Sequence, residues 1–255
     1  MKFQEQQRTP LFDALKKYVA DKTVPFHVPG HKGGKGIPEF RSFVGENVLS
    51  IDVTSGLLDL DTICNPLGVI QEAEELAACA FGADHAHFLV NGTTSGIQAM
   101  ILSVAGPGDE IIIPRNAHRS VTGGLILSGV KPVYIKPVID NYMGIAMGIT
   151  PESVRRAIVE HPNAKAVFVI NPTYYGVASD LKRIVEIAHS YGKPVIVDEA
   201  HGAHLGFHPD LPLSAMEAGA DMSAVSVHKL LGSMTQSSIL LVKGDLIDDR
   251  KVKAA

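Results

Sequence analysis

Short runs rich in valine and isoleucine alternate with segments of helical periodicity through most of this 255-residue chain, and this alternation constrains its fold more than any other feature. Strands are expected at residues 87–90, 110–113, 133–135, 167–170, 195–197, 224–227 and 239–242. Helices are expected at residues 69–81, 95–104, 118–127, 151–160, 181–191 and 213–218. Near-continuous apolar runs are typical of strands that are covered on both faces. The pattern therefore predicts an α/β fold, in which a mostly parallel sheet is flanked by helices.

The first part of the chain lacks this alternation, and we expect it to form an arm. Thr9 and Pro10 resemble an N-cap and a first helical residue, and the residues after them keep helical spacing as far as residue 21. Residues 24–61 are rich in Gly and Pro, which is typical of an extended arm that is either mobile or lies on a partner subunit. The predicted division is residues 1–61 for the N-terminal helix and arm, and residues 62–255 for a large domain.

A lysine and an acid each follow the end of a predicted buried strand. Lys229 ends the motif Ser-Val-His-Lys, and Asp198 begins the motif Asp-Glu-Ala-His. A lysine there is badly placed as a solubilising surface charge; partial burial beside an imidazole would make it a reactive amine, although a strand-end lysine that reaches water is the simpler alternative. This pair is what a pyridoxal 5'-phosphate enzyme needs. The lysine forms a Schiff base with the cofactor aldehyde, and the acid keeps the pyridine nitrogen protonated.

Two further motifs follow predicted strands. The segment Asn-Gly-Thr-Thr-Ser-Gly at residues 91–96 opens a helix, where hydroxyls and unpaired amides favour an anion. The chain contains neither a Walker loop nor a G-x-G-x-x-G fingerprint. By itself the segment is equally well explained as a helix cap, but together with Asp198 and Lys229 it favours a cofactor phosphate. His118 lies at another strand end, where it either stacks on a cofactor ring or begins a surface helix.

Histidines after the same strand as Asp198 allow a different hypothesis. His201, His204 and His208, with Asp198 or Glu199, could form a metal site of a hydrolase. The glycines between them predict a loop, in which the three imidazoles need not face one point. Exposed loop histidines are the third interpretation.

Composition and charge exclude other classes. The chain carries 23 basic and 27 acidic residues, a net charge of −4, without the basic stripe of a nucleic-acid-binding protein. Cys64 and Cys79 do not form a C-x-x-C pair, and we expect both to be reduced. We find no signal peptide and no apolar run of membrane-spanning length, so a cytoplasmic location is expected.

Five motifs occur in the order in which a known family has them. They are PFHVPGHKGG, NGTTSG, PRNAHRS, DEAHGAH and SVHKLLGSMTQSS. Together they resemble the fold type I PLP-dependent ornithine/lysine/arginine decarboxylases, from about residue 26 to residue 242. The motifs are specific for the family but do not select one substrate within it.

The resemblance implies a role for each matching residue. Lys229 is similar to the Schiff-base lysine, Asp198 to the partner of the pyridine N–H, and His118 to the histidine stacked on the ring. The other implied cofactor-binding residues are Thr93, Thr94, Ser95, His201, Ser226 and His228. His228 or Lys229 is the implied proton donor to the substrate carbon after CO2 leaves. No metal ligand is implied.

The resemblance also implies an activity: decarboxylation of a basic amino acid, arginine first and lysine or ornithine next, to an amine used in polyamine biosynthesis. It implies a homodimer or larger homo-oligomer. Family members continue past residue 255 into a C-terminal domain, so we expect this chain alone to be weakly active or inactive. Three alternatives stay open at this point: an aminotransferase or aldolase-type enzyme of the same fold, the metal-dependent hydrolase, and an inactive truncated remnant.

Overall fold

The structure is a computed structural model that describes residues 5–57 and 59–255, and it divides into two compact units, Met1–Ala80 and Phe81–Ala255. The helices of the first unit are α1 (Pro10–Ala20), α2 (Pro38–Val44), α3 (Glu46–Ser50) and most of α4 (Val69–Phe81), after a 3₁₀ turn at Glu5–Gln7. The predicted first helix and the helix at 69–81 are confirmed. The predicted domain boundary at residue 61 stays a prediction, and residues 1–4 and 58 of the predicted arm lie outside the described residues.

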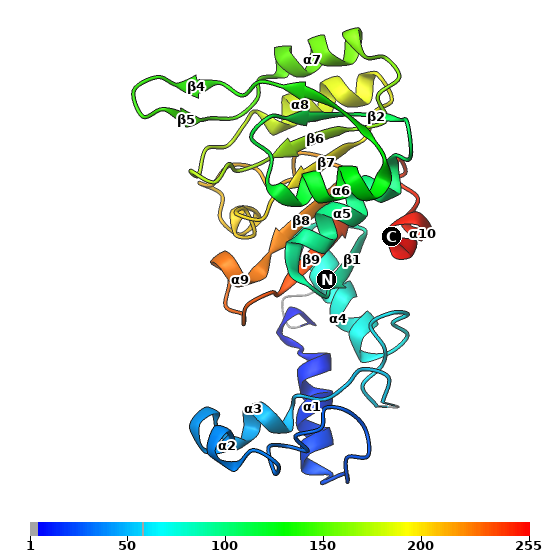
Figure 1. The fold of residues 1–255 in the computed structure, drawn as a ribbon, viewed down its shortest axis with the longest axis vertical. Coiled ribbons are helices and arrows are strands. Elements are labelled where there is room, and N and C mark those ends of the chain that lie inside the picture. Colours follow the sequence, from blue (N-terminus) through cyan, green and yellow to red (C-terminus); the bar gives the residue numbers. More distant parts are fainter. Residues whose placement is uncertain (1–4, 58) are drawn as a thin grey trace. The chain divides into compact units, whose positions relative to one another are not determined.

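A seven-stranded sheet forms the second unit, in the order β1-β9-β8-β7-β6-β2-β3 (Figure 1). Its strands are β1 (His85–Leu89), β2 (Glu110–Pro114), β3 (Lys131–Ile135), β6 (Val167–Ile170), β7 (Val195–Asp198), β8 (Met222–Ser226) and β9 (Ser238–Val242). The neighbours from β8 to β3 pair in parallel, whereas β9 runs antiparallel to both β8 and β1. The prediction of a mostly parallel sheet is therefore confirmed.

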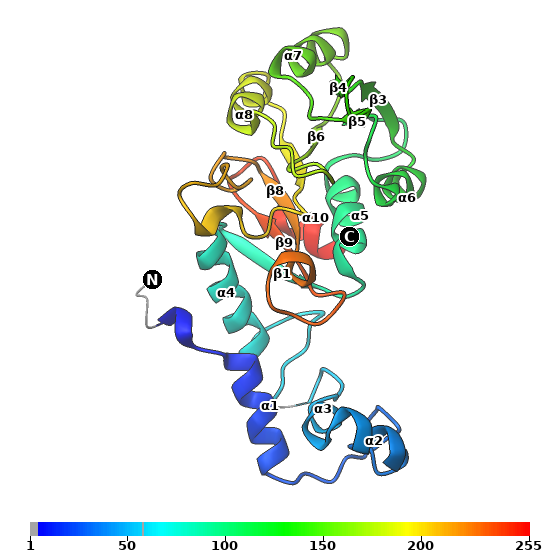
Figure 2. The ribbon, with the colours of Figure 1, turned by 90° about the vertical axis from the view of Figure 1, so that its left-hand side faces the viewer.

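Helices cover both faces of this sheet (Figures 1 and 2). They are α5 (Gly92–Val104), α6 (Arg119–Ser128) and α10 (Asp249–Ala254) on one face, and α7 (Pro151–Glu160) and α8 (Leu181–Ser190) on the other. The core under α5 and α6 includes the fully buried Phe168 of β6 and Met222 of β8. Because alternate side chains of a strand point to opposite faces, Val167 and Val169 bury the other side of β6. In the described part of the chain, no helix is long and apolar enough to cross a membrane.

Two features differ from the sequence prediction. Residues 215–219 form turns and not the predicted helix at 213–218, because the buried Glu199 carboxyl accepts a hydrogen bond from the Ala215 amide (2.7 Å) and Ser214 bonds Glu217. A hairpin of two short strands, β4 (Ile139–Asp140) and β5 (Ile145–Ala146), was not predicted.

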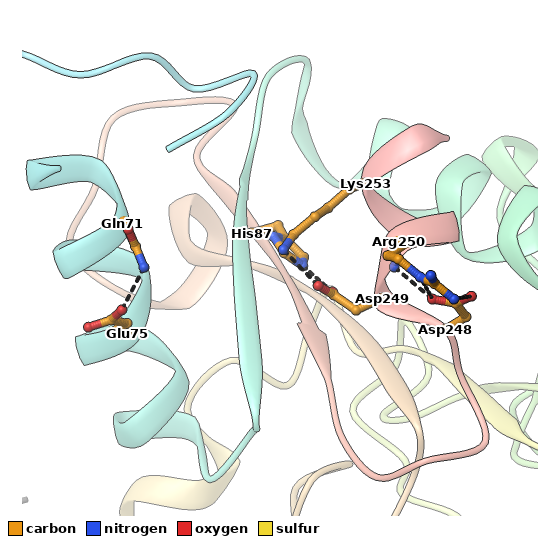
Figure 3. Close-up of polar contacts among 7 residues, drawn as sticks. All are labelled: Gln71, Glu75, His87, Asp248, Asp249, Arg250 and Lys253. Carbon is orange, nitrogen blue, oxygen red and sulfur yellow. Dashed lines mark hydrogen bonds and ion pairs between the residues drawn. The ribbon is translucent and has the colours of Figure 1, made fainter. Parts of the chain in front are cut away.

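The last helix is held on the sheet by an ion-pair network (Figure 3). His87 Nε2 on β1 lies 2.7 Å from Asp249 Oδ1, and Lys253 Nζ lies 2.8 Å from Asp249 Oδ2. Val252 is buried beneath them in the core under α5. Within the first unit, Gln71 donates to Glu75 one turn later on α4 (3.0 Å; Figure 3).

Candidate active site

A cavity of about 750 Å³ lies at the carboxyl ends of the parallel strands. Open α/β sheets bind their ligands at this edge. Most of the residues that line it come from the ends of β1, β2, β6, β7 and β8 and the segments that follow them, and Ala146 comes from the β4–β5 hairpin. They are Asn91, Gly92, Thr93, Thr94, Ile97, Asn116, His118, Ala146, Ile170, Thr173, Tyr174, Tyr175, Asp198, Ala200, His201, Ser226, His228, Lys229 and Gln236. Eight of the nine cofactor-binding residues predicted from the sequence line this cavity, and the predicted catalytic residues are all among those eight.

Lys229 reaches this cavity from a short helix, α9 (Val227–Leu230), that directly follows β8. Its side chain is exposed, so the predicted partial burial is wrong: one helical turn lifts it away from the covered strand end. Its neighbour is His201, whose Nε2 lies 3.2 Å from Lys229 Nζ. The sequence suggested His228 as the imidazole beside Lys229. The Nδ1 atom of His228 instead donates a hydrogen bond to the Ser237 carbonyl (2.7 Å), so the ring uses Nδ1 and not Nε2 for this bond.

His201 is a neutral acceptor for the lysine. Burial lowers the pKa of His201, and the positive charge of Lys229 lowers it further. A neutral imidazole accepts a hydrogen bond from an ammonium group, so His201 can hold the Lys229 amine in place. The rings of Tyr174 and His201 pack edge to face, with 5.4 Å between the ring centroids.

Asp198 ends β7 and is 5% exposed. Its Oδ1 accepts a hydrogen bond from the Ala200 amide (3.1 Å). Among the described residues, this bond to Oδ1 is the one that the Asp198 carboxyl makes, and the residue also lines the cavity. Burial raises the pKa of Asp198, and the Ala200 N–H and the charge of Lys229 oppose that rise. A buried carboxyl with one oxygen unused is suited to a cationic N–H donor, which stabilises its charged form.

His118 is fixed by its own helix. It is the N-cap of α6, and its Nδ1 accepts from the Ser120 amide (3.2 Å) and lies 2.8 Å from the Ser120 hydroxyl. Because Nδ1 is an acceptor, the hydrogen-bond geometry assigns the ring proton to Nε2. Ser120 is buried, so the ring that lines the cavity is held in one orientation.

The first turn of α5 has the features of an anion site. Thr93 and Thr94 line the cavity beside Gly92, at a helix N-terminus whose amides and dipole favour negative charge. Ser95 is not among the lining residues, because its hydroxyl donates back to the carbonyls of Val90 and Gly92 (2.8 Å each). The Ser95 hydroxyl is therefore directed at backbone carbonyls of its own segment.

A family model described as the major domain of Orn/Lys/Arg decarboxylases matches residues 9–255. The chain belongs to the Orn/Lys/Arg decarboxylase family. It is 56% identical to the arginine decarboxylase of Bacillus subtilis (strain 168) over 250 residues, which cover 98% of this chain and 51% of that protein. The chain thus spans about half the length of the curated relatives it matches.

Solved structures agree with this assignment. The lysine decarboxylase LdcF of Francisella novicida aligns with a TM-score of 0.84 and 29% identity, covering 96% of this chain and 37% of that one. The pyridoxal-5'-phosphate-dependent protein YhfS of Escherichia coli aligns with a TM-score of 0.60 over 98% of this chain and 57% of that one, at 17% identity. The latter likeness supports the fold alone. This Orn/Lys/Arg decarboxylase family chain therefore has the fold type I architecture that its motifs predict.

The structure does not assemble the alternative metal site in this family member. Among the described residues, no three His, Cys, Asp or Glu side chains form a group that could hold a metal ion. His201 lies beside Lys229, while His208 is exposed with its Nδ1 3.9 Å from an oxygen of Asp210. Asp198 and His201 both line the cavity, because they lie at or just after the end of β7. His208 follows in the glycine-containing loop and does not line the cavity.

The sequence analysis did not identify several residues that line the cavity. Tyr174 and Tyr175 follow β6 and pack edge to face, with 5.6 Å between their ring centroids. Like Asp198, the two tyrosines lie at the carboxyl end of a predicted strand, and this position could have identified them from the sequence. Ala146 of the β4–β5 hairpin and Gln236 also line the cavity, and neither lies at a strand end that the apolar pattern predicts.

Proposed function

We propose that the protein of which this chain forms part decarboxylates a basic amino acid, arginine first and lysine or ornithine next, with pyridoxal 5'-phosphate as cofactor. Family membership and the identity with a B. subtilis arginine decarboxylase support the reaction class. The observation that carries the proposal is the convergence of the Lys229 amine, the Asp198 carboxyl and the first turn of α5 on one cavity.

The residues present fit this cofactor. Lys229 supplies the amine for covalent attachment, and the unused oxygen of Asp198 suits the pyridine N–H. His118 lines the cavity with its ring fixed, as a stacking partner requires. The N-terminus of α5 with Thr94 and Ser226 supplies donors for the phosphate. When bound, pyridoxal 5'-phosphate supplies an electron sink for the departing carboxylate.

The chain's own residues then control charge and protons. Asp198 holds a proton on the ring nitrogen as an ion pair inside a buried site, where charge-assisted hydrogen bonds are strong. His201 would hold the Lys229 amine in position beside the cofactor. His228 directs Nδ1 at the Ser237 carbonyl, so its Nε2 can exchange a proton with the substrate carbon, as Lys229 also can.

Covalent mapping tests the cofactor part. The purified protein is loaded with pyridoxal 5'-phosphate, reduced with borohydride, digested and examined by mass spectrometry. We expect the pyridoxyl group on Lys229, its loss in Lys229→Ala, and its retention in the control Lys182→Ala, an exposed lysine of α8 outside the cavity. Labelling at another lysine, or none, contradicts the proposal.

Product analysis tests the reaction and its substrate. The full-length protein should release CO2 and an amine from arginine, with lysine and ornithine turned over more slowly. A keto acid in place of CO2 would instead indicate an aminotransferase. A homodimer or larger homo-oligomer in the cytoplasm is part of the same proposal, and sedimentation of the full-length protein tests the assembly. We also expect the 255-residue chain alone to be weakly active or inactive, which the same assay measures.

A further inference from the structure

Three buried hydroxyl groups meet beside the cavity. Thr93 Oγ1 lies 2.5 Å from Ser226 Oγ and 2.6 Å from Ser238 Oγ. These residues are 8%, 1% and 3% exposed, respectively. Hydroxyl groups this close and this buried are hydrogen-bonded to one another, because leaving either contact without a proton would place oxygen lone pairs face to face.

The three hydroxyls connect separate elements of the sheet edge. Thr93 is in the first turn of α5, Ser226 is the last residue of β8, and Ser238 is the first residue of β9. Ser226 and Ser238 are directly paired in the antiparallel register of β8 and β9. Thr93 and Ser226 line the cavity, whereas Ser238 is not among its lining residues. The Ser238 hydroxyl therefore reaches the cavity through its bond to Thr93.

Counting protons fixes the direction of the bonds when an anion is present. Each hydroxyl has one proton to donate. If Ser226 donates its proton to an anion in the cavity, the contact between Thr93 and Ser226 must use the proton of Thr93. The contact between Thr93 and Ser238 must then use the proton of Ser238. The chain of donors runs from Ser238 to Thr93 to Ser226 to the anion, and bonds in such a chain strengthen one another.

We propose that Ser238 is a positioning residue of the phosphate site: through Thr93 it orients the Ser226 hydroxyl as a donor to the phosphate of the cofactor. This inference rests on the proposed function, because the anion is the cofactor phosphate. It assigns a role to a buried serine in β9 that makes no direct contact with the cavity.

The test compares two ligands that differ by the phosphate. Dissociation constants of the purified apoprotein for pyridoxal 5'-phosphate and for pyridoxal are measured by titration. The dissociation constant for pyridoxal divided by that for pyridoxal 5'-phosphate reports the contribution of the phosphate to binding. In Ser238→Ala we expect this ratio to fall about three- to tenfold, as for one net hydrogen bond, with the pyridoxal affinity unchanged. Ser103→Ala is the control, because Ser103 is a buried serine of α5 that bonds Met100 and lies outside the cavity.

A double-mutant cycle tests the route through Thr93. Thr93→Val removes both hydroxyl contacts, so we expect the double variant with Ser238→Ala to bind no more weakly than Thr93→Val alone. Additive losses, or an equal loss for both ligands in Ser238→Ala, would overturn the proposal for Ser238 while leaving the cofactor site intact. A wild-type protein that binds both ligands equally would overturn the phosphate site, and the proposed function with it.

Discussion

Glu199 provides a pH-dependent test of how the site is supported. The side chain is 1% exposed and joins two segments: Oε1 accepts from the Ala215 amide (2.7 Å), and Oε2 lies 2.8 Å from the Ser223 hydroxyl. Burial raises the pKa of Glu199 from 4.5 to about 8, against the opposing effect of these two hydrogen bonds. The folded protein therefore keeps a proton on Glu199 at neutral pH that the unfolded chain releases.

The sign of the effect follows from this difference. Between pH 4.5 and about pH 8 the folded state binds a proton at Glu199 that the unfolded state has released. The contribution of this proton to the free energy of unfolding is therefore fully present below pH 4.5 and is lost as pH rises through the pKa of the folded state. At about 1.4 kcal/mol for each pH unit, that interval corresponds to a loss of about 5 kcal/mol in the free energy of unfolding.

Glu199→Gln removes the titration while keeping the shape. The glutamine carbonyl can accept from the Ala215 amide, and its NH2 group can donate to Ser223. We expect the variant to match the wild type near pH 4.5 and to be more stable by about 5 kcal/mol near pH 9, measured by urea unfolding at a series of pH values. Glu186→Gln, on the exposed surface of α8, is the control. Parallel pH curves for the wild type and Glu199→Gln would refute the argument.

Three further predictions concern packing and charge. Phe168→Ala should lower the free energy of unfolding by about 3–5 kcal/mol in urea, since the ring is fully buried; a loss below about 1 kcal/mol would mean that the core refills. Gly202→Ala should cost about 1–3 kcal/mol in the same assay, because its Cβ would lie 2.6 Å from Glu199 Cγ and 2.8 Å from Pro172 Cδ; an unchanged midpoint would speak against this crowding. Asp198→Asn should weaken pyridoxal 5'-phosphate binding by about 10- to 100-fold in a titration. It should not weaken binding of an analogue with a benzene ring in place of the pyridine, and an equal loss for both ligands would contradict the ion pair.

The apolar runs predicted the sheet well because burial on two faces leaves a local signal. All seven predicted strands occur, and the strand at 167–170 has the predicted bounds. The turns at residues 215–219 could not be predicted in the same way. Their conformation depends on the Glu199 side chain, whose position is set by β7, so the information lies in a contact distant in sequence.

The candidate site was predictable to the extent that strand ends locate residues. Asp198, His118 and Lys229 line one cavity because their strands end at the same edge of the sheet. Side-chain partners were not predictable: Lys229 contacts His201, and Thr93 bonds Ser226 and Ser238. Those contacts depend on the register of β8 and β9 and on a helical turn after β8, which periodicity does not determine.

The place of β1 in the sheet has a consequence for synthesis on the ribosome. Its partner strand is β9, which follows it by roughly 150 residues, and it stands at the end of the strand order. At translation rates of about 5–20 residues per second, β9 is synthesised on the order of ten to thirty seconds after β1, and β1 has no sheet partner during this interval. An unpaired strand edge is an aggregation hazard during that time, so the nascent chain should depend on chaperones more than a protein whose neighbouring strands are made in succession.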